Sequence, residues 1–187
     1  MRYLSAAAVL LAAGTLTYGA QVPRPSPDYT FNLPGGKQVQ LSDHKGKVIA
    51  LEFLKPSCPH CQNTAKILTK LQSEYGPRGF QALGVATEGD PIAFAKQFGV
   101  TYPVGTSTPD GIFSYLQHSV MDRNFYVPQL VIIDRGGTIR AQHSGVDPFF
   151  KDEEKNIRAL VEKLLSEPPP KENESGANQK NPKKRSS

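Results

Sequence analysis

The stretch VIALEFLKPSCPHC, residues 48–61, joins an apolar segment to the only two cysteines of the chain. Residues 48–54 form a nearly continuous apolar run, which is typical of a central strand that is covered on both faces. From Cys61 to Tyr75 the apolar residues recur at helical spacing. The stretch therefore predicts a strand, a short turn and a helix, with both thiols at the start of that helix.

The spacing of the two cysteines favours redox chemistry over a structural role. A disulfide with only two residues between its ends closes a very small loop, so it removes little entropy from the unfolded chain. Cys58 is expected at the helix N-terminus, where unpaired amides and the helix dipole stabilise a thiolate. Cys58 is therefore the predicted nucleophile, and Cys61, one turn further on, is the predicted resolving thiol.

The two residues between the cysteines, Pro59 and His60, are candidates for tuning the site. A cationic or hydrogen-bonding His60 would further stabilise the Cys58 thiolate. The alternative is that His60 is a solvated turn residue with no role in the chemistry.

Glu52 is the one charged residue inside the apolar run 48–54. A carboxyl group in a dry strand should have a raised pKa, so it could accept the proton of Cys61 during exchange. The alternatives are that Glu52 reaches water at the end of the sheet or pairs with Lys55.

The rest of the chain predicts an α/β domain with a mixed sheet and helices on both faces. Alternating residues around a Gly-Gly turn predict a hairpin near the N-terminus, and a second hairpin follows Pro128. The expected order is β-β-β-α-β-α-α-β-β-α. Its segments are strands at 29–33, 37–41, 47–54, 80–87, 129–134 and 138–143, and helices at 61–75, 90–98, 108–118 and from 147 onward.

These pieces, in this order, resemble the thioredoxin fold. The resemblance rests on the apolar strand, Cys58-Pro59-His60-Cys61, the helix, Val127-Pro128 and the hairpin around Asp134-Arg135-Gly136-Gly137. More narrowly, residues 27–165 are similar to the exported redoxin branch typified by TlpA and ResA, which carries an extra N-terminal β-hairpin and a βα-type insertion before the proline. The resemblance implies that the Val127–Pro128 bond is cis, that it packs against the cysteines, and that the backbone of Val127 binds the substrate chain.

The resemblance implies a thiol–disulfide oxidoreductase but leaves the direction of the reaction open. Proteins of the TlpA and ResA type are mostly reductases. The Pro59-His60 dipeptide and the Val before Pro128 instead match DsbA-type oxidases. A site that stabilises the Cys58 thiolate makes the disulfide more oxidising, so we expect a reduction potential above that of thioredoxin.

Both ends of the chain differ in composition from its middle. Residues 1–20 have one positive charge and a short apolar stretch, which predicts a signal peptide, with an uncleaved N-terminal anchor as the alternative. Residues 21–167 are the expected redoxin domain. Residues 168–187 are almost purely polar, with five basic residues against two acidic ones, and predict a disordered basic tail. The net charge of +5 therefore comes mainly from the tail and indicates no nucleic-acid-binding face.

The predicted setting is the periplasm or another extracytoplasmic compartment. Expected partners are protein thiol or disulfide substrates and a membrane or periplasmic redox partner, acting on a monomer without a cofactor. Two alternatives remain. A peroxiredoxin-like peroxidase shares the scaffold, although Lys55 stands where its peroxide site needs a Thr. A copper- or metal-binding module could use Cys58, Cys61 and a histidine, although a closed zinc site usually has four ligands.

Overall fold

Strand β4 (Val48–Leu54) lies in the middle of an eight-stranded sheet of order β1-β8-β7-β4-β5-β6-β2-β3. The structure is a computed structural model that describes residues 21–119 and 124–168. Strand β4 is parallel to β5 (Phe80–Ala86) and antiparallel to β7 (Gln129–Ile133), so the sheet is mixed, as expected. The other strands are β1 (Arg24–Pro25), β2 (Thr30–Asn32), β3 (Gln38–Gln40), β6 (Val104–Thr106) and β8 (Thr138–Ser144).

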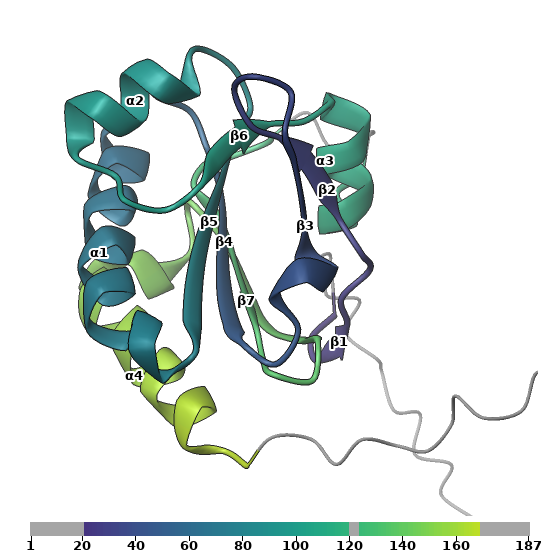
Figure 1. The fold of residues 1–187 in the computed structure, drawn as a ribbon, viewed down its shortest axis with the longest axis vertical. Coiled ribbons are helices and arrows are strands. Elements are labelled where there is room, and N and C mark those ends of the chain that lie inside the picture. The colour runs from purple at the N-terminus through teal and green to yellow at the C-terminus, as the bar shows by residue number, and fades with distance from the viewer. Residues whose placement is uncertain (1–20, 120–123, 169–187) are drawn as a thin grey trace, which may run out of the picture.

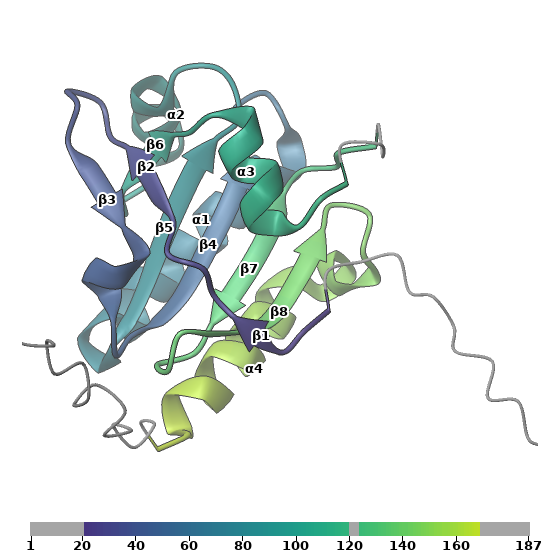
Figure 2. The same ribbon diagram turned by 90° about the vertical axis from the view of Figure 1, so that its right-hand side faces the viewer.

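Four α-helices cover the sheet on its two faces (Figures 1 and 2). Helices α1, α2 and α4 lie on one face, and α3 lies on the other. Their bounds are α1 (Pro59–Tyr75), α2 (Pro91–Phe98), α3 (Pro109–Leu116) and α4 (Glu153–Ser166). The expected α/β class, with a mixed sheet and helices on both faces, is confirmed.

The alternation of β4 divides the core into two layers, because successive side chains of a strand point to opposite faces. Ile49, Leu51 and Phe53 pack with the N-terminal hairpin and α3. Val48, Ala50 and Leu54 pack with α1, α2 and α4. Glu52 shares the parity of this second set, so its carboxyl group enters the layer that contains the cysteines.

Strand β1, of two residues, is missing from the expected order. Strand β6 is missing too, and the insertion before Pro128 is α2-β6-α3. The strand is only three residues long and contains Gly105, so no alternation marks it in the sequence. A Cβ on Gly105 would lie 2.3 Å from the carbonyl oxygen of Asn32. Glycine is therefore required for β2 to pair with β6, which is how the N-terminal hairpin joins the sheet.

The expected helix at Asp147-Pro148 begins instead as a 3-10 turn, Pro148–Asp152, and the α-helix starts at Glu153. The carboxylate of Asp147 accepts the amide of Phe149 at 2.8 Å, as a helix cap does. Glu153 and Glu154 stand in the first turn of α4, where acidic residues are also favourable. The sequence thus contains two start signals, and the chain uses both.

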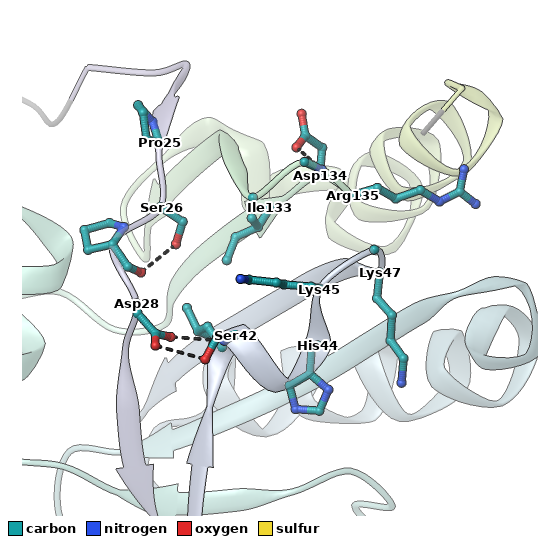
Figure 3. Close-up of a pocket in the computed structure, with 15 residues that line it drawn as sticks. Pro25, Ser26, Asp28, Ser42, His44, Lys45, Lys47, Ile133, Asp134 and Arg135 are labelled. Carbon is teal, nitrogen blue, oxygen red and sulfur yellow. Dashed lines mark hydrogen bonds between the residues drawn. The ribbon is translucent and has the colours of Figure 1, made fainter. Parts of the chain in front are cut away.

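Figure 3 shows a cavity of about 730 Å³ that is lined by residues 25–28, 41–42, 44–47 and 133–137. It lies at the end of β4 opposite the cysteines. Lys47 precedes β4 on its rim, whereas Cys58 follows the other end of that strand. The predicted signal or anchor (1–20) and almost all of the predicted tail (168–187) lie outside the described residues. Within residues 21–119 and 124–168, no helix is both long and apolar enough to span a bilayer.

Candidate active site

Cys58 occupies the N-cap position of α1, as the sequence predicts. The turn that delivers it is held by the Cys58 amide, which donates to the Lys55 carbonyl at 2.9 Å, and by Gln62 Nε2, which donates to the Pro56 carbonyl at 2.9 Å. Pro59 is the first residue of α1, where a missing amide proton costs nothing. Both Pro59 and His60 are exposed.

The two thiols differ in access, and both are free. Cys58 is partly exposed, whereas Cys61 is fully buried. Burial raises the pKa of the Cys61 thiol, and the charge of Glu52 raises it further. The hydrogen bond from the Lys55 amide lowers this pKa, but by less than burial raises it. That amide donates to Cys61 Sγ at 3.5 Å. An accessible first thiol and a protected second thiol are the arrangement that sequential thiol–disulfide exchange needs.

The Val127–Pro128 peptide bond is cis, as the resemblance implies. The Cys58 thiol donates to the Val127 carbonyl oxygen at 3.8 Å, which brings residues 69 positions apart into one site. The chain after β8 also reaches this loop. A Cβ on Gly145 would lie 2.3 Å from the same carbonyl oxygen, so only glycine allows so close an approach.

Glu52 lies fully buried beneath the cysteines on β4. Burial raises the pKa of its carboxyl well above the ordinary value, and nearby Glu153 adds to the effect, while a hydrogen bond from Tyr102 opposes it. Tyr102 donates to Glu52 Oε2 at 3.4 Å, and Oε1 has no partner in the described part of the chain. The alternative pairing with Lys55 is wrong, since the Lys55 ammonium binds Glu88 at 2.9 Å.

Tyr102 and Glu153, which also influence the pKa of Glu52, were not among the site residues predicted from the sequence. Tyr102 precedes a strand that the pattern does not mark. Glu153 carried a readable signal, because it stands four residues before the buried Ile157 and so falls on the same face of α4.

The chain matches the Redoxin family over residues 19–161. It belongs to the redoxin family. This redoxin is 25% identical over 119 residues to thiol-disulfide oxidoreductase ResA of Geobacillus kaustophilus, which covers 62% of this chain and 64% of ResA. It is 26% identical over 148 residues to Protein DipZ of Mycobacterium tuberculosis, covering 75% of this chain and 20% of DipZ. The chain thus spans about one fifth of DipZ and less than two thirds of ResA.

Solved structures agree with the family in fold. A structure from Bacteroides thetaiotaomicron, assigned as a protein disulfide isomerase, is 28% identical with a TM-score of 0.64, covering 79% of this chain and 91% of that one. A thiol:disulfide interchange protein of the thioredoxin family from Chlorobium tepidum has a TM-score of 0.64 at 22% identity, covering 78% and 99%. The second likeness supports the thioredoxin-like fold of this redoxin.

Proposed function

We propose that this redoxin is an extracytoplasmic thiol–disulfide oxidoreductase that exchanges disulfides with protein substrates through Cys58 and Cys61. The observation that carries the proposal is the pairing of an accessible Cys58 with a buried Cys61, beside the Val127 carbonyl. The relatives named as a thiol-disulfide oxidoreductase and as a protein disulfide isomerase support the same chemistry.

In the reductive direction, the Cys58 thiolate attacks one sulfur of a substrate disulfide. A mixed disulfide forms, and the other substrate sulfur leaves as a thiolate. Cys61 then loses its proton to Glu52 and attacks Cys58 Sγ, so that the Cys58–Cys61 disulfide forms and the second substrate sulfur leaves. Two electrons and two protons pass to the substrate, and the same steps in reverse oxidise a dithiol.

The backbone of Val127 is proposed to hold the substrate chain as an added strand next to Cys58. The carbonyl that accepts the Cys58 thiol in the free protein is available to a substrate amide once Cys58 has reacted. His60 is proposed to tune the potential from its exposed position between the thiols.

The extracytoplasmic location rests on the signal-like pattern of residues 1–20, and a membrane or periplasmic redox partner would then restore the active form. Fractionation of cells that produce the full chain tests the location. Recovery of the protein only in the cytoplasm contradicts it.

The function is tested by insulin reduction and by reoxidation of reduced RNase, with Cys58→Ser and Cys61→Ser as variants. Cys58→Ser should abolish exchange in both assays. Cys61→Ser should accumulate a mixed disulfide between Cys58 and the substrate, because the resolving thiol is gone. Full activity of Cys58→Ser, or no trapped species with Cys61→Ser, contradicts the assigned roles.

The described residues give the alternatives no added support. Residues 21–119 and 124–168 bring together no group of three or more His, Cys, Asp or Glu side chains suited to a metal ion. Lys55, at the position where a peroxide site needs a Thr, pairs instead with Glu88.

A further inference from the structure

Glu153 is a nearly buried carboxylate that the proposed exchange mechanism does not use. It is the first residue of α4, and its two oxygens bind adjacent side chains of α1. Asn63 Nδ2 donates to Oε2 at 2.8 Å, and the Thr64 hydroxyl lies in short hydrogen-bond contact with Oε1. Burying a carboxylate away from water costs free energy, and the hydrogen bonds from Asn63 and Thr64 offset part of that cost and fix the position of the group.

Thr64 connects this carboxylate to the turn that contains the cysteines. It is fully buried, stands three residues after Cys61, and its Oγ1 also lies 3.1 Å from the His60 carbonyl oxygen. A hydroxyl has one proton to donate. When Glu153 is ionised, Thr64 donates to it. When Glu153 is protonated, the carboxyl group can donate to Thr64, and the hydroxyl proton is free for the His60 carbonyl.

Glu153 and Glu52 lie on the side of the sheet where α4 packs, at the start of α4 and in the middle of β4. Burial raises the pKa of the Glu52 carboxyl, and the nearby charge of Glu153 raises it further. Three parts of the fold supply the side chains around the two carboxyl groups. From β4 comes Glu52; from α1 come Cys58, Cys61, Asn63 and Thr64; from the segment before β6 comes Tyr102.

The charged residues next to Glu153 in the sequence are exposed or form ion pairs with other residues. Asp152 and Lys155 are exposed. The next residue, Glu154, binds Lys70 at 2.6 Å and Arg158 at 3.1 Å on the outer side of the helix. Glu154 is therefore a matched control: it has the same side chain one position further on, with no contact to the cysteine turn.

We propose that Glu153 is a positioning residue for disulfide exchange, which anchors the first turn of α1 through Thr64 and acts with Glu52 as one carboxyl pair that holds the proton of Cys61. This inference rests on the proposed function. The Cys61 thiol gives its proton to the pair, and its electron pair forms the bond to Cys58 Sγ. The bond between Cys58 and the substrate breaks, and the departing substrate thiolate takes up the proton from the pair.

The direct test is a carboxyl ¹³C NMR titration of the full chain, reduced and labelled at Glu. The Glu52 resonance is assigned by its loss in Glu52→Gln. In Glu153→Gln, which keeps one of the two oxygen acceptors, the midpoint of Glu52 should fall to lower pH, because the neighbouring charge is gone. In Glu154→Gln it should stay at the wild-type value. An unchanged Glu52 midpoint in Glu153→Gln overturns the proposal.

A second reading uses the wild-type chain alone, so that it stands even where Glu153→Gln lowers stability. Two coupled carboxyl groups titrate in steps that belong to the pair. The Glu52 resonance should therefore depart from the titration curve of a single independent site. A curve that fits a single independent site contradicts the pair.

Exchange kinetics then connect the pair to the chemistry. The pH profile of insulin reduction should move to lower pH in Glu153→Gln, and this shift should vanish when Glu52 is already Gln, as interacting residues require in a double-mutant cycle. The wild-type chain could exchange no disulfides while the Glu52 midpoint still falls in Glu153→Gln. In that case the proposed function fails and the carboxyl pair stands. If exchange proceeds with the same pH profile in Glu153→Gln, the role of Glu153 is overturned and the proposed function stands.

Discussion

Gly145→Ala tests whether the contact between the end of β8 and the Val127–Pro128 loop sets the geometry of the site. The new Cβ would lie 2.3 Å from the Val127 carbonyl oxygen, 2.7 Å from its carbon and 3.1 Å from the Pro128 nitrogen. All three are backbone atoms, so no rotamer change relieves the clash. The oxygen must move from 2.3 Å to at least 3.0 Å, the shortest distance that a Cβ ordinarily tolerates.

Two losses follow from this displacement. Overpacking of this kind costs about 1–3 kcal/mol of stability, which lowers Tm by roughly 6 °C for a domain of this size. The same carbonyl oxygen accepts the Cys58 thiol at 3.8 Å, so the loop also shifts relative to the nucleophile. A misplacement approaching 1 Å at a reacting centre can cost about 100-fold in rate, or about 2.7 kcal/mol.

The assays are urea unfolding and insulin reduction on the same preparations, at a temperature where both proteins are folded. Gly111→Ala is the control. Its Cβ meets only the side-chain hydroxyls of Thr108 and Ser107, at 3.1 and 3.3 Å, and an alanine inside α3 favours the helix. Wild-type insulin reduction by Gly145→Ala refutes the coupling between this contact and Cys58, even where stability falls.

Three further predictions follow from the same structure. Glu52→Gln should unfold with a weaker pH dependence than the wild type. The carboxyl of Glu52 has a raised pKa when folded, so its contribution to stability is complete below about pH 4.5 and is lost as the pH rises through the folded pKa, with a slope of at most about 1.4 kcal/mol per pH unit. Parallel urea-unfolding profiles between pH 5 and 8 contradict this. His60→Ala should lower the reduction potential in equilibrium with glutathione by on the order of 30 mV, about 1.4 kcal/mol for two electrons, and an unchanged potential removes His60 from the chemistry. Asp90→Ala should lower the free energy of unfolding by about 1 kcal/mol while insulin reduction is unchanged, because the Asp90 carboxylate caps α2 by accepting the Ile92 amide at 2.8 Å; equal stability contradicts the cap.

Local patterns in the sequence were enough for the strand and helix that carry the cysteines. Residues 48–61 specify a buried strand, a turn and a helix with Cys58 at its start, because apolar periodicity and helix-start chemistry act between near neighbours. The proline at 128 and the two hairpins followed from equally local signals and from the family resemblance. The raised pKa of Glu52 followed from one charge in an apolar run, since burial alone dictates its direction.

The short strand β6 and the true start of α4 needed the tertiary structure. Strand β6 forms by pairing with β5 along its length and with β2 at Thr106, and three residues with a central glycine carry no periodic signal of that pairing. The start of α4 is ambiguous locally, because the Asp147 cap is followed within a few residues by the acidic first turn of α4, Glu153 and Glu154.

The sequence by itself determined that two thiols stand at a helix N-terminus above a buried acid. The family resemblance implied that Val127–Pro128 packs against the cysteines, but only the tertiary structure decided which atoms meet: the Val127 carbonyl beside Cys58, and Glu153 on the far side of Thr64. These contacts join residues 69 and 89 positions apart. Their geometry depends on how β7 and α4 pack against β4 and α1, and no pattern between near neighbours in the chain encodes a distance across the core. The electrostatic environment of the exchange site is therefore a property of the packed fold.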